Sequence, residues 1–142
     1  VGFPGESHED FLETYHFLND LDVSYLHVFT YSERANTDAA VMEGAVPMET
    51  RRERNEMLRI LSQKKQRDFY SRFMGSSRPV LFETHTADES LMSGFTDNYI
   101  KVCLPKSETL INSCRQVQLI DFDATGDYVM ALPVPDSEHA VL

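Results

Sequence analysis

The sequence is poor in cysteine and has no long apolar run, and each shortage excludes a class of protein. Its only cysteines among 142 residues, Cys103 and Cys114, lack the spacing of a CxxC motif. Two cysteines are too few for a disulfide framework, so we interpret them as the reduced thiols of a cytoplasmic protein. The five histidines do not occur at metal-ligand spacing, so we expect no zinc site. No stretch of about 18 apolar residues is present, so we expect no membrane span.

Positive charge is also in short supply. The chain has 13 basic and 23 acidic residues and a formal net charge of −10. Such a balance predicts no strong overall attraction to nucleic acid or to anionic lipid. The first residues, Val1-Gly2-Phe3-Pro4, have neither an initiator methionine nor the basic region of a signal peptide. We therefore expect the sequence to be a fragment of a longer protein, with more of the fold upstream.

Residues 1–40 have the pattern of a βαβ unit, which predicts a parallel sheet. A turn at Gly2–Glu6 precedes Ser7 and Asp10, which are spaced as a helix capping box. A helical apolar period then predicts a helix over residues 9–21. The β-branched and aromatic run Tyr25–Tyr31 predicts a strand that leads into a polar loop. Because α/β proteins commonly place their sites after such strands, this loop is the first candidate site.

A long helix is predicted over residues 49–74, and it holds most of the basic side chains. Between Glu49 and Arg72 there are eight basic and only four acidic residues. One interpretation is a solvated face with ion pairs such as Arg52–Glu56. The other is a stripe facing phosphate groups, made of Arg51, Arg52, Arg54, Arg59, Lys64, Lys65, Arg67 and Arg72.

The pattern changes to short strands after a linker at Gly75–Pro79. Strand-like runs are Val80–Thr84, Leu91–Phe95, Tyr99–Leu104, Val117–Phe122 and Tyr128–Leu132, with a hairpin turn at Ala124–Asp127. Five short strands without a helix predict a small five-stranded antiparallel barrel. Barrels of this size often bind single-stranded or looped nucleic acid. The expected fold class is therefore α/β followed by all-β.

Several segments, in one order along the chain, resemble the radical-SAM methylthiotransferases. Val1–Phe11 is similar to their VGFPGET-x-x-DF segment, and His27–Ala40 is similar to their HVFPYSxRPGTxAA segment. Val46-Pro47 and Arg52-Glu53-Arg54 fall at their QVP and KxER motifs. Val80–Glu83 and Gly94–Val102 resemble the beginning and centre of their C-terminal TRAM barrel. The sequence departs from these motifs at Thr30, Ala45 and Ala35-Asn36, where Asn36 can still adopt the positive φ of the usual glycine.

The resemblance implies the C-terminal part of such an enzyme. Residues 1–75 would be the last βα units of a partial TIM-like barrel, and residues 76–142 an OB-like TRAM domain. The family's cofactors are S-adenosylmethionine and two 4Fe–4S clusters, but the CxxxCxxC motif that binds one cluster is not in this sequence. No catalytic residue or metal ligand is therefore assigned, and activity would need a missing N-terminal half.

The motifs resemble most the branch that acts on threonylcarbamoyladenosine in tRNA, so the implied partner is a tRNA anticodon stem-loop. Two alternatives remain. One is a methylthiotransferase that acts on an aspartate of a ribosomal protein. The other is a stand-alone RNA-binding module.

The resemblance also implies binding residues in the first part of the chain. Gly2, Phe3 and Pro4 would lie beside the adenine of S-adenosylmethionine, although a plain turn explains them equally well. The substrate mouth would be lined by Tyr31, Ser32, Arg34 and Thr37. The simpler explanations are packing for Tyr31, and an ion pair with Glu33 or Asp38 for Arg34.

In the second part, the RNA face of the barrel would be formed by Phe95, Asn98, Tyr99 and Lys101. The alternative for Phe95 and Tyr99 is the barrel core. From Arg78 onward, ten acidic residues outnumber four basic ones. This balance argues against a barrel that binds RNA by itself.

Overall fold

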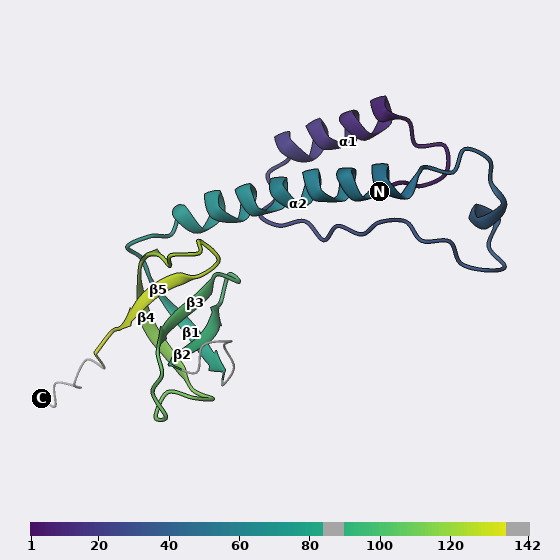
Figure 1. Ribbon diagram of the computed structural model, residues 1–142. Helices are drawn as coiled ribbons and strands as arrows, with labels where there is room; N and C mark the ends of the chain where they lie inside the picture. The colour runs from purple at the N-terminus through teal and green to yellow at the C-terminus, as the bar shows by residue number, and fades with distance from the viewer. Residues whose placement is uncertain (84–89, 136–142) are drawn as a thin grey trace, which may run out of the picture. The chain divides into compact units, whose positions relative to one another are not determined.

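The computed structural model describes residues 1–83 and 90–135. The chain divides into two compact units, Val1–Asp68 and Phe69–Leu142. The first unit contains helices and long extended segments, and the second contains five strands (Figure 1). No helix in the described part of the chain is long and apolar enough to cross a membrane.

Helix α1 runs from His8 to Asp20 and begins with the predicted capping box. The Asp10 carboxylate accepts a hydrogen bond from the Ser7 N–H at 2.8 Å, and the Ser7 hydroxyl accepts one from the Asp10 N–H at 3.0 Å. The bond from the Ser7 N–H is the main reason that the pKa of Asp10 is lowered. The capping box thus satisfies amide groups that the start of a helix leaves open.

Helix α2 runs from Met48 to Ser71. Its residues Leu58 and Leu61 are buried with Phe11 of α1 in a small apolar cluster. Lys65 donates hydrogen bonds from Nζ to the carbonyl oxygens of Asn19 and Leu21, at 2.9 and 2.7 Å. The lysine therefore satisfies carbonyl groups that the end of α1 leaves open. A short 3-10 helix, Asp38–Val41, lies in the loop before α2.

Residues 23–31 are extended and run along α2 on the side away from α1 (Figure 1). Their side chains alternate, because Tyr25, His27 and Phe29 are exposed whereas Leu26 and Val28 pack against the apolar cluster. The Ser62 hydroxyl on α2 accepts a hydrogen bond from the Leu26 N–H at 2.9 Å and donates one to the Leu26 carbonyl at 3.2 Å. A side chain thus replaces the neighbouring strand at this position.

The strand predicted for Tyr25–Tyr31 is absent, and the described residues do not form a partial TIM-like barrel. A β-ladder needs a neighbouring strand along its whole length, but here Val1 alone pairs with the extended segment in this way. The Val1 amino group donates to the Phe29 carbonyl, and the Tyr31 N–H donates to the Val1 carbonyl, both at 2.7 Å. These two bonds have the pattern of a parallel ladder, limited to a single residue.

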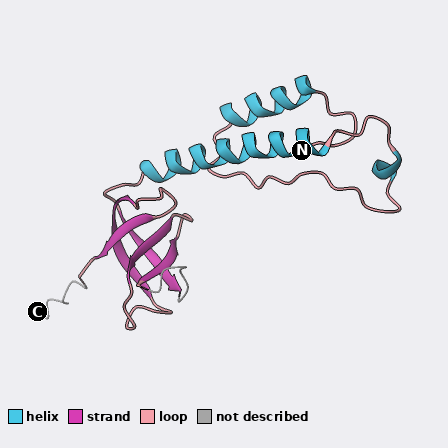
Figure 2. Ribbon diagram, in the orientation of Figure 1, coloured by secondary structure: helices cyan, strands magenta, loops and turns pink. Residues whose placement is uncertain are grey.

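The second unit is a closed five-stranded barrel (Figure 2). Its strands are β1 (Ser77–Glu83), β2 (Leu91–Thr96), β3 (Lys101–Pro105), β4 (Cys114–Phe122) and β5 (Val129–Pro133). They are ordered β1-β2-β3-β5-β4 around the barrel. The predicted five-stranded barrel is confirmed, but β3 and β5 pair in parallel. A ring with an odd number of strands cannot be antiparallel throughout, so the predicted antiparallel pairing holds for four strand pairs and fails between β3 and β5.

The barrel core is made of apolar side chains that alternate along the strands. Its buried members are Tyr70, Val80, Phe82, Met92, Ile100, Val102, Leu104, Val117, Leu119, Val129 and Ala131. Strands β1 and β2 approach closely at Gly94, where a Cβ atom would lie 2.1 Å from the Leu81 carbonyl oxygen. Of the predicted first strand, only Thr84 lies outside the described residues.

The predicted turn between β4 and β5 is organised by Asp123. Burial raises the pKa of this carboxyl, but hydrogen bonds from Thr125, Tyr128 and Asp127 outweigh burial and lower the pKa. The turn lets β4 and β5 pair antiparallel, as predicted.

Candidate functional site

The loop that contains Gly2, Phe3 and Pro4 is held by a glutamate at its own end. The Gly2 N–H donates to Glu6 Oε1 at 3.1 Å, and the Glu6 N–H donates to the Phe3 carbonyl at 3.0 Å. Gly2 is buried with φ of +83°, and a Cβ atom there would lie 2.4 Å from Cγ of Arg51. Glycine is therefore required for the backbone conformation and for the packing of the Arg51 stem. Pro4 is buried, whereas Phe3 is exposed.

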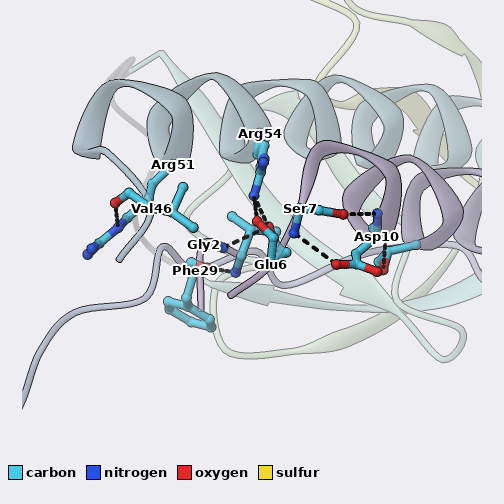
Figure 3. A network of polar contacts seen from close by, with 10 residues as sticks. Gly2, Glu6, Ser7, Asp10, Phe29, Val46, Arg51 and Arg54 are labelled. Carbon is cyan, nitrogen blue, oxygen red and sulfur yellow. Dashed lines mark hydrogen bonds and ion pairs between the residues drawn. The ribbon is translucent and has the colours of Figure 1, made fainter. Parts of the chain in front are cut away.

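Arg54 of α2 points from the helix toward Glu6 at the end of this loop (Figure 3). Its Nη1 donates to the Glu6 carboxylate and to the Glu6 carbonyl, the latter at 3.1 Å. Its guanidinium also lies over the Phe11 ring, 5.4 Å from the ring centre. Arg54 is only 6% exposed, so this ion pair is shielded from solvent on the arginine side.

Arg51, one turn earlier, joins three segments of the first unit. Its Nε donates to the Val46 carbonyl at 2.7 Å, its Nη1 to the Tyr31 carbonyl at 3.1 Å, and its Nη2 to Glu33 Oε1 at 2.6 Å. The last bond lowers the pKa of the Glu33 carboxyl and raises that of Arg51. Glu33 pairs with Arg51, and no ion pair joins Arg34 to Glu33 or to Asp38 among the described residues, so the simpler explanation for Arg34 is wrong.

The structure brings the predicted cofactor and substrate segments together at Phe3 and Tyr31. The two rings meet edge to face with centres 5.4 Å apart. The Tyr31 hydroxyl is buried and has no hydrogen-bond partner among the described residues. Tyr31 is thus half-buried, as the packing interpretation expected, but it keeps an unused polar atom.

The other three residues of the predicted substrate mouth lie in the exposed loop that follows. Ser32, Arg34 and Thr37 are exposed, and the Thr37 hydroxyl donates to the Arg34 carbonyl at 2.8 Å. Asn36 has a φ of 64°, so it does adopt the positive φ that was expected for it. Among the described residues, no side-chain hydrogen bond or ring contact joins Ser32, Arg34 or Thr37 to Phe3 or to the Tyr31 ring.

An open groove of about 580 Å³ lies between α2 and the extended segment, within the first unit. Its lining is polar apart from one isoleucine and consists of Thr30, Arg52, Asn55, Glu56, Arg59, Ile60 and Gln63. The Asn55 amide donates weakly to the Val28 carbonyl, at 3.4 Å. Neither the Arg52 nor the Glu56 side chain has a hydrogen bond or ion pair within the described residues, so the predicted Arg52–Glu56 pair is wrong.

Of the predicted RNA-binding residues on the barrel, Phe95 and Tyr99 are exposed, whereas Asn98 and Lys101 are half-buried. Phe95 is 42% and Tyr99 is 80% exposed, so the alternative that placed them in the core is wrong. Their ring centres are 6.5 Å apart, and Lys101 is the register partner of Phe95 on the neighbouring strand. Lys101 Nζ lies 4.3 Å from the centre of the Tyr128 ring, a residue that the sequence analysis did not select.

The backbone around Tyr99 is held by hydrogen bonds to two side-chain hydroxyl groups. The Tyr70 hydroxyl accepts a hydrogen bond from the Lys101 N–H at 3.1 Å. The Thr96 hydroxyl accepts from the Ile100 N–H at 2.8 Å and donates to Asn98 Oδ1 at 2.6 Å. Asn98 therefore serves the turn through its oxygen, while its buried Nδ2 has no partner among the described residues.

Arg51 and Arg54 fit neither the solvated face nor the phosphate-facing stripe that the basic run predicted. Both are buried, at 4% and 6% exposure. Their spacing with Leu58 and Leu61 would have revealed this, because positions 51, 54, 58 and 61 lie on one face of a helix. The positions of these two arginines along the helix, rather than their charge, indicate that they are buried.

Similarity to known proteins places these residues in a family. No protein-family model matches the chain. It is, however, 37% identical over 123 residues to the threonylcarbamoyladenosine tRNA methylthiotransferase MtaB of Bacillus subtilis, covering 84% of this chain and 27% of that protein. It is 39% identical over 102 residues to MtaB of Aquifex aeolicus, covering 72% of this chain and 23% of that protein.

A protein with a different kind of substrate in its name also matches. The ribosomal protein uS12 methylthiotransferase RimO of Alkaliphilus oremlandii is 31% identical over 137 residues, covering 89% of this chain and 31% of that protein. Over most of its length the chain is thus homologous to methylthiotransferases, and it spans about a quarter of the length of the MtaB relatives it matches. Within the family its identity is higher to these two MtaB proteins than to this RimO, in agreement with the predicted resemblance.

Proposed function

We propose that this chain is the C-terminal part of a radical-SAM tRNA methylthiotransferase that acts on threonylcarbamoyladenosine next to the anticodon. Residues 1–75 would supply part of the mouth for cofactor and substrate, and residues 76–142 would be a TRAM domain that holds the tRNA. The observation that carries the proposal is the 37% identity to an MtaB protein over 84% of the chain.

The outer surface of the barrel suits looped RNA. Tyr99 offers an exposed ring on which a base can stack, and Phe95 lies beside it. Lys101 supplies a positive charge next to these rings and next to Tyr128. An aromatic surface with one lysine can bind RNA even though the barrel as a whole is acidic, because stacking does not depend on net charge.

The contact between Phe3 and Tyr31 suits the mouth of a site. Bound S-adenosylmethionine and two 4Fe–4S clusters would supply the radical and sulfur chemistry in such an enzyme. Phe3 and Tyr31, with exposed ring surface and an unpartnered hydroxyl, fit a position beside the adenine better than Gly2, whose N–H already binds Glu6. No three potential metal-ligating side chains come together in the described residues, so we assign no cluster ligand to them.

A ribosomal-protein substrate is the second candidate. It is favoured by the 31% identity to RimO and by the net charge of −10, which suits a basic partner. The two candidates predict opposite preferences for RNA and for a basic peptide.

Binding of a labelled anticodon stem-loop by the 142-residue chain tests the proposal. We expect binding that weakens steeply with salt, and we expect Tyr99→Ala to cost about 1–3 kcal/mol because one stacked base is lost. Tyr25→Ala removes another exposed tyrosine, from the first unit, and is the matched control that should leave binding unchanged. Absence of RNA binding at low salt, together with binding of a basic ribosomal-protein peptide, would replace the tRNA proposal by the second candidate.

A further inference from the structure

Two arginines of α2, Arg52 and Arg59, make no side-chain hydrogen bond or ion pair that stabilises the described part of the first unit. Of the eight basic residues predicted to form one stripe, Arg51 and Arg54 are buried in ion pairs and Lys65 binds carbonyl groups of the α1 end. Arg52 and Arg59 are exposed, and neither guanidinium group has a hydrogen bond or ion pair among the described residues. Both line the groove between α2 and the extended segment.

The two guanidiniums are arranged along the groove rather than at a single point. Positions 52 and 59 are seven residues apart, which places them on one face of α2 and about 10 Å apart along its axis. Asn55 and Gln63 add amide groups and Thr30 adds a hydroxyl group on the opposite wall. The groove therefore offers several donors in a row, which suits an extended ligand with repeated acceptors.

The sign of the charge in the groove differs from that of the whole chain. Two arginines face one carboxylate, Glu56, whereas the chain carries a net charge of −10. Guanidinium groups bind phosphate through paired hydrogen bonds, and amide and hydroxyl groups can bind ribose hydroxyls. Ile60 is 51% exposed and adds an apolar surface suited to a sugar or base face. A basic protein segment would be repelled by the same two arginines.

The geometry points to this groove as a second binding site for RNA, one that takes the ribose-phosphate backbone. The inference rests on the proposed function, in which tRNA is the partner, and it adds contacts that lie outside the barrel. It also explains how an acidic barrel can act on tRNA, since part of the electrostatic affinity then comes from α2.

Charge-matched variants of the 142-residue chain test the site. Arg52→Gln, Arg59→Gln and the double variant are compared with Lys64→Gln, an exposed basic residue of the same helix outside the groove. The probe is the labelled anticodon stem-loop, titrated over a potassium chloride series, and far-UV circular dichroism verifies that each variant is folded. Each groove substitution should reduce the slope of log affinity against log salt by about 0.7–0.9, and the double variant by about twice as much.

The possible results separate the groove from the general charge of the helix. If Lys64→Gln reduces the salt slope as much as Arg59→Gln, a diffuse field acts and the groove inference is overturned. If the double variant binds like the unaltered chain while Tyr99→Ala weakens binding, the groove inference is wrong and the proposed function stands. If the unaltered chain binds no RNA, the proposed function is wrong, and the inference that the groove binds RNA is wrong with it.

Discussion

The two units of this chain hold their surfaces in place by different means. Among the described residues of the barrel, eleven buried side chains form one core, nearly all of them apolar, and strand ladders close the sheet. In the first unit, the apolar cluster has only three buried members, and two buried arginines bind the loops. The barrel thus depends on packing that is shared among many residues, whereas the first unit depends on a few polar contacts.

The largest effect is expected from truncation in the barrel core. Phe82 is completely buried, so Phe82→Ala should lower the free energy of unfolding of the barrel by about 3–5 kcal/mol. Phe95→Ala removes the same side chain from the outer surface of the adjacent strand and should cost much less. Hydrogen exchange measured by mass spectrometry would follow peptides of each unit separately. Equal effects of the two substitutions would contradict the concentration of stability in the core.

The next effect is expected from the buried ion pair of the first unit. Arg54→Ala leaves Glu6 without its charged partner and should lower the stability of the first unit by about 3 kcal/mol. Arg52→Ala, on the exposed face of the same helix, is the matched control and should change stability by less than about 0.5 kcal/mol. The measurement is again hydrogen exchange, in peptides from residues 1–20. Unchanged protection in Arg54→Ala would show that the polar contacts are dispensable.

The smallest effect is expected from acid. The hydrogen bond from Arg51 lowers the pKa of Glu33 in the folded chain, so its contribution is present above the ordinary carboxyl pKa and is lost as pH falls through the lowered value. The first unit should therefore lose stability below about pH 4.5. Glu33→Gln should make this part of the pH profile flatter in thermal melts, without altering the contribution of Asp123 in the barrel. A profile that Glu33→Gln leaves unaltered would mean that the pair contributes nothing.

The sequence predicted features that depend on neighbouring residues and failed where distant partners decide. The capping box at Ser7 and Asp10 and the turn at Asp123 are local, and both were found. The run Tyr25–Tyr31 has strand composition, but a strand exists only with a hydrogen-bonded neighbour, and here Ser62 and Val1 supply isolated bonds.

Composition likewise misled the assignment of charged and aromatic residues. Arg51 and Arg54 are basic, yet their partners Glu33 and Glu6 lie far away in the sequence, so their burial could not be inferred from charge alone. Phe95 and Tyr99 are aromatic but exposed, because the pleat of β2 and a turn with positive φ at Tyr99 direct them outward. The position of a residue on its helix or strand carried the information that its type did not.

The three hydrogen bonds of Arg51 have a consequence for the loop of residues 34–45. They reach Tyr31 and Glu33 before the loop and Val46 after it, so one side chain fixes both of its ends. The free-energy cost of lengthening a loop with fixed ends grows only slowly, by about 0.6 kcal/mol for each doubling. The loop can therefore change in length and composition while its ends keep their positions, because the bonds of Arg51 do not involve the residues between those ends.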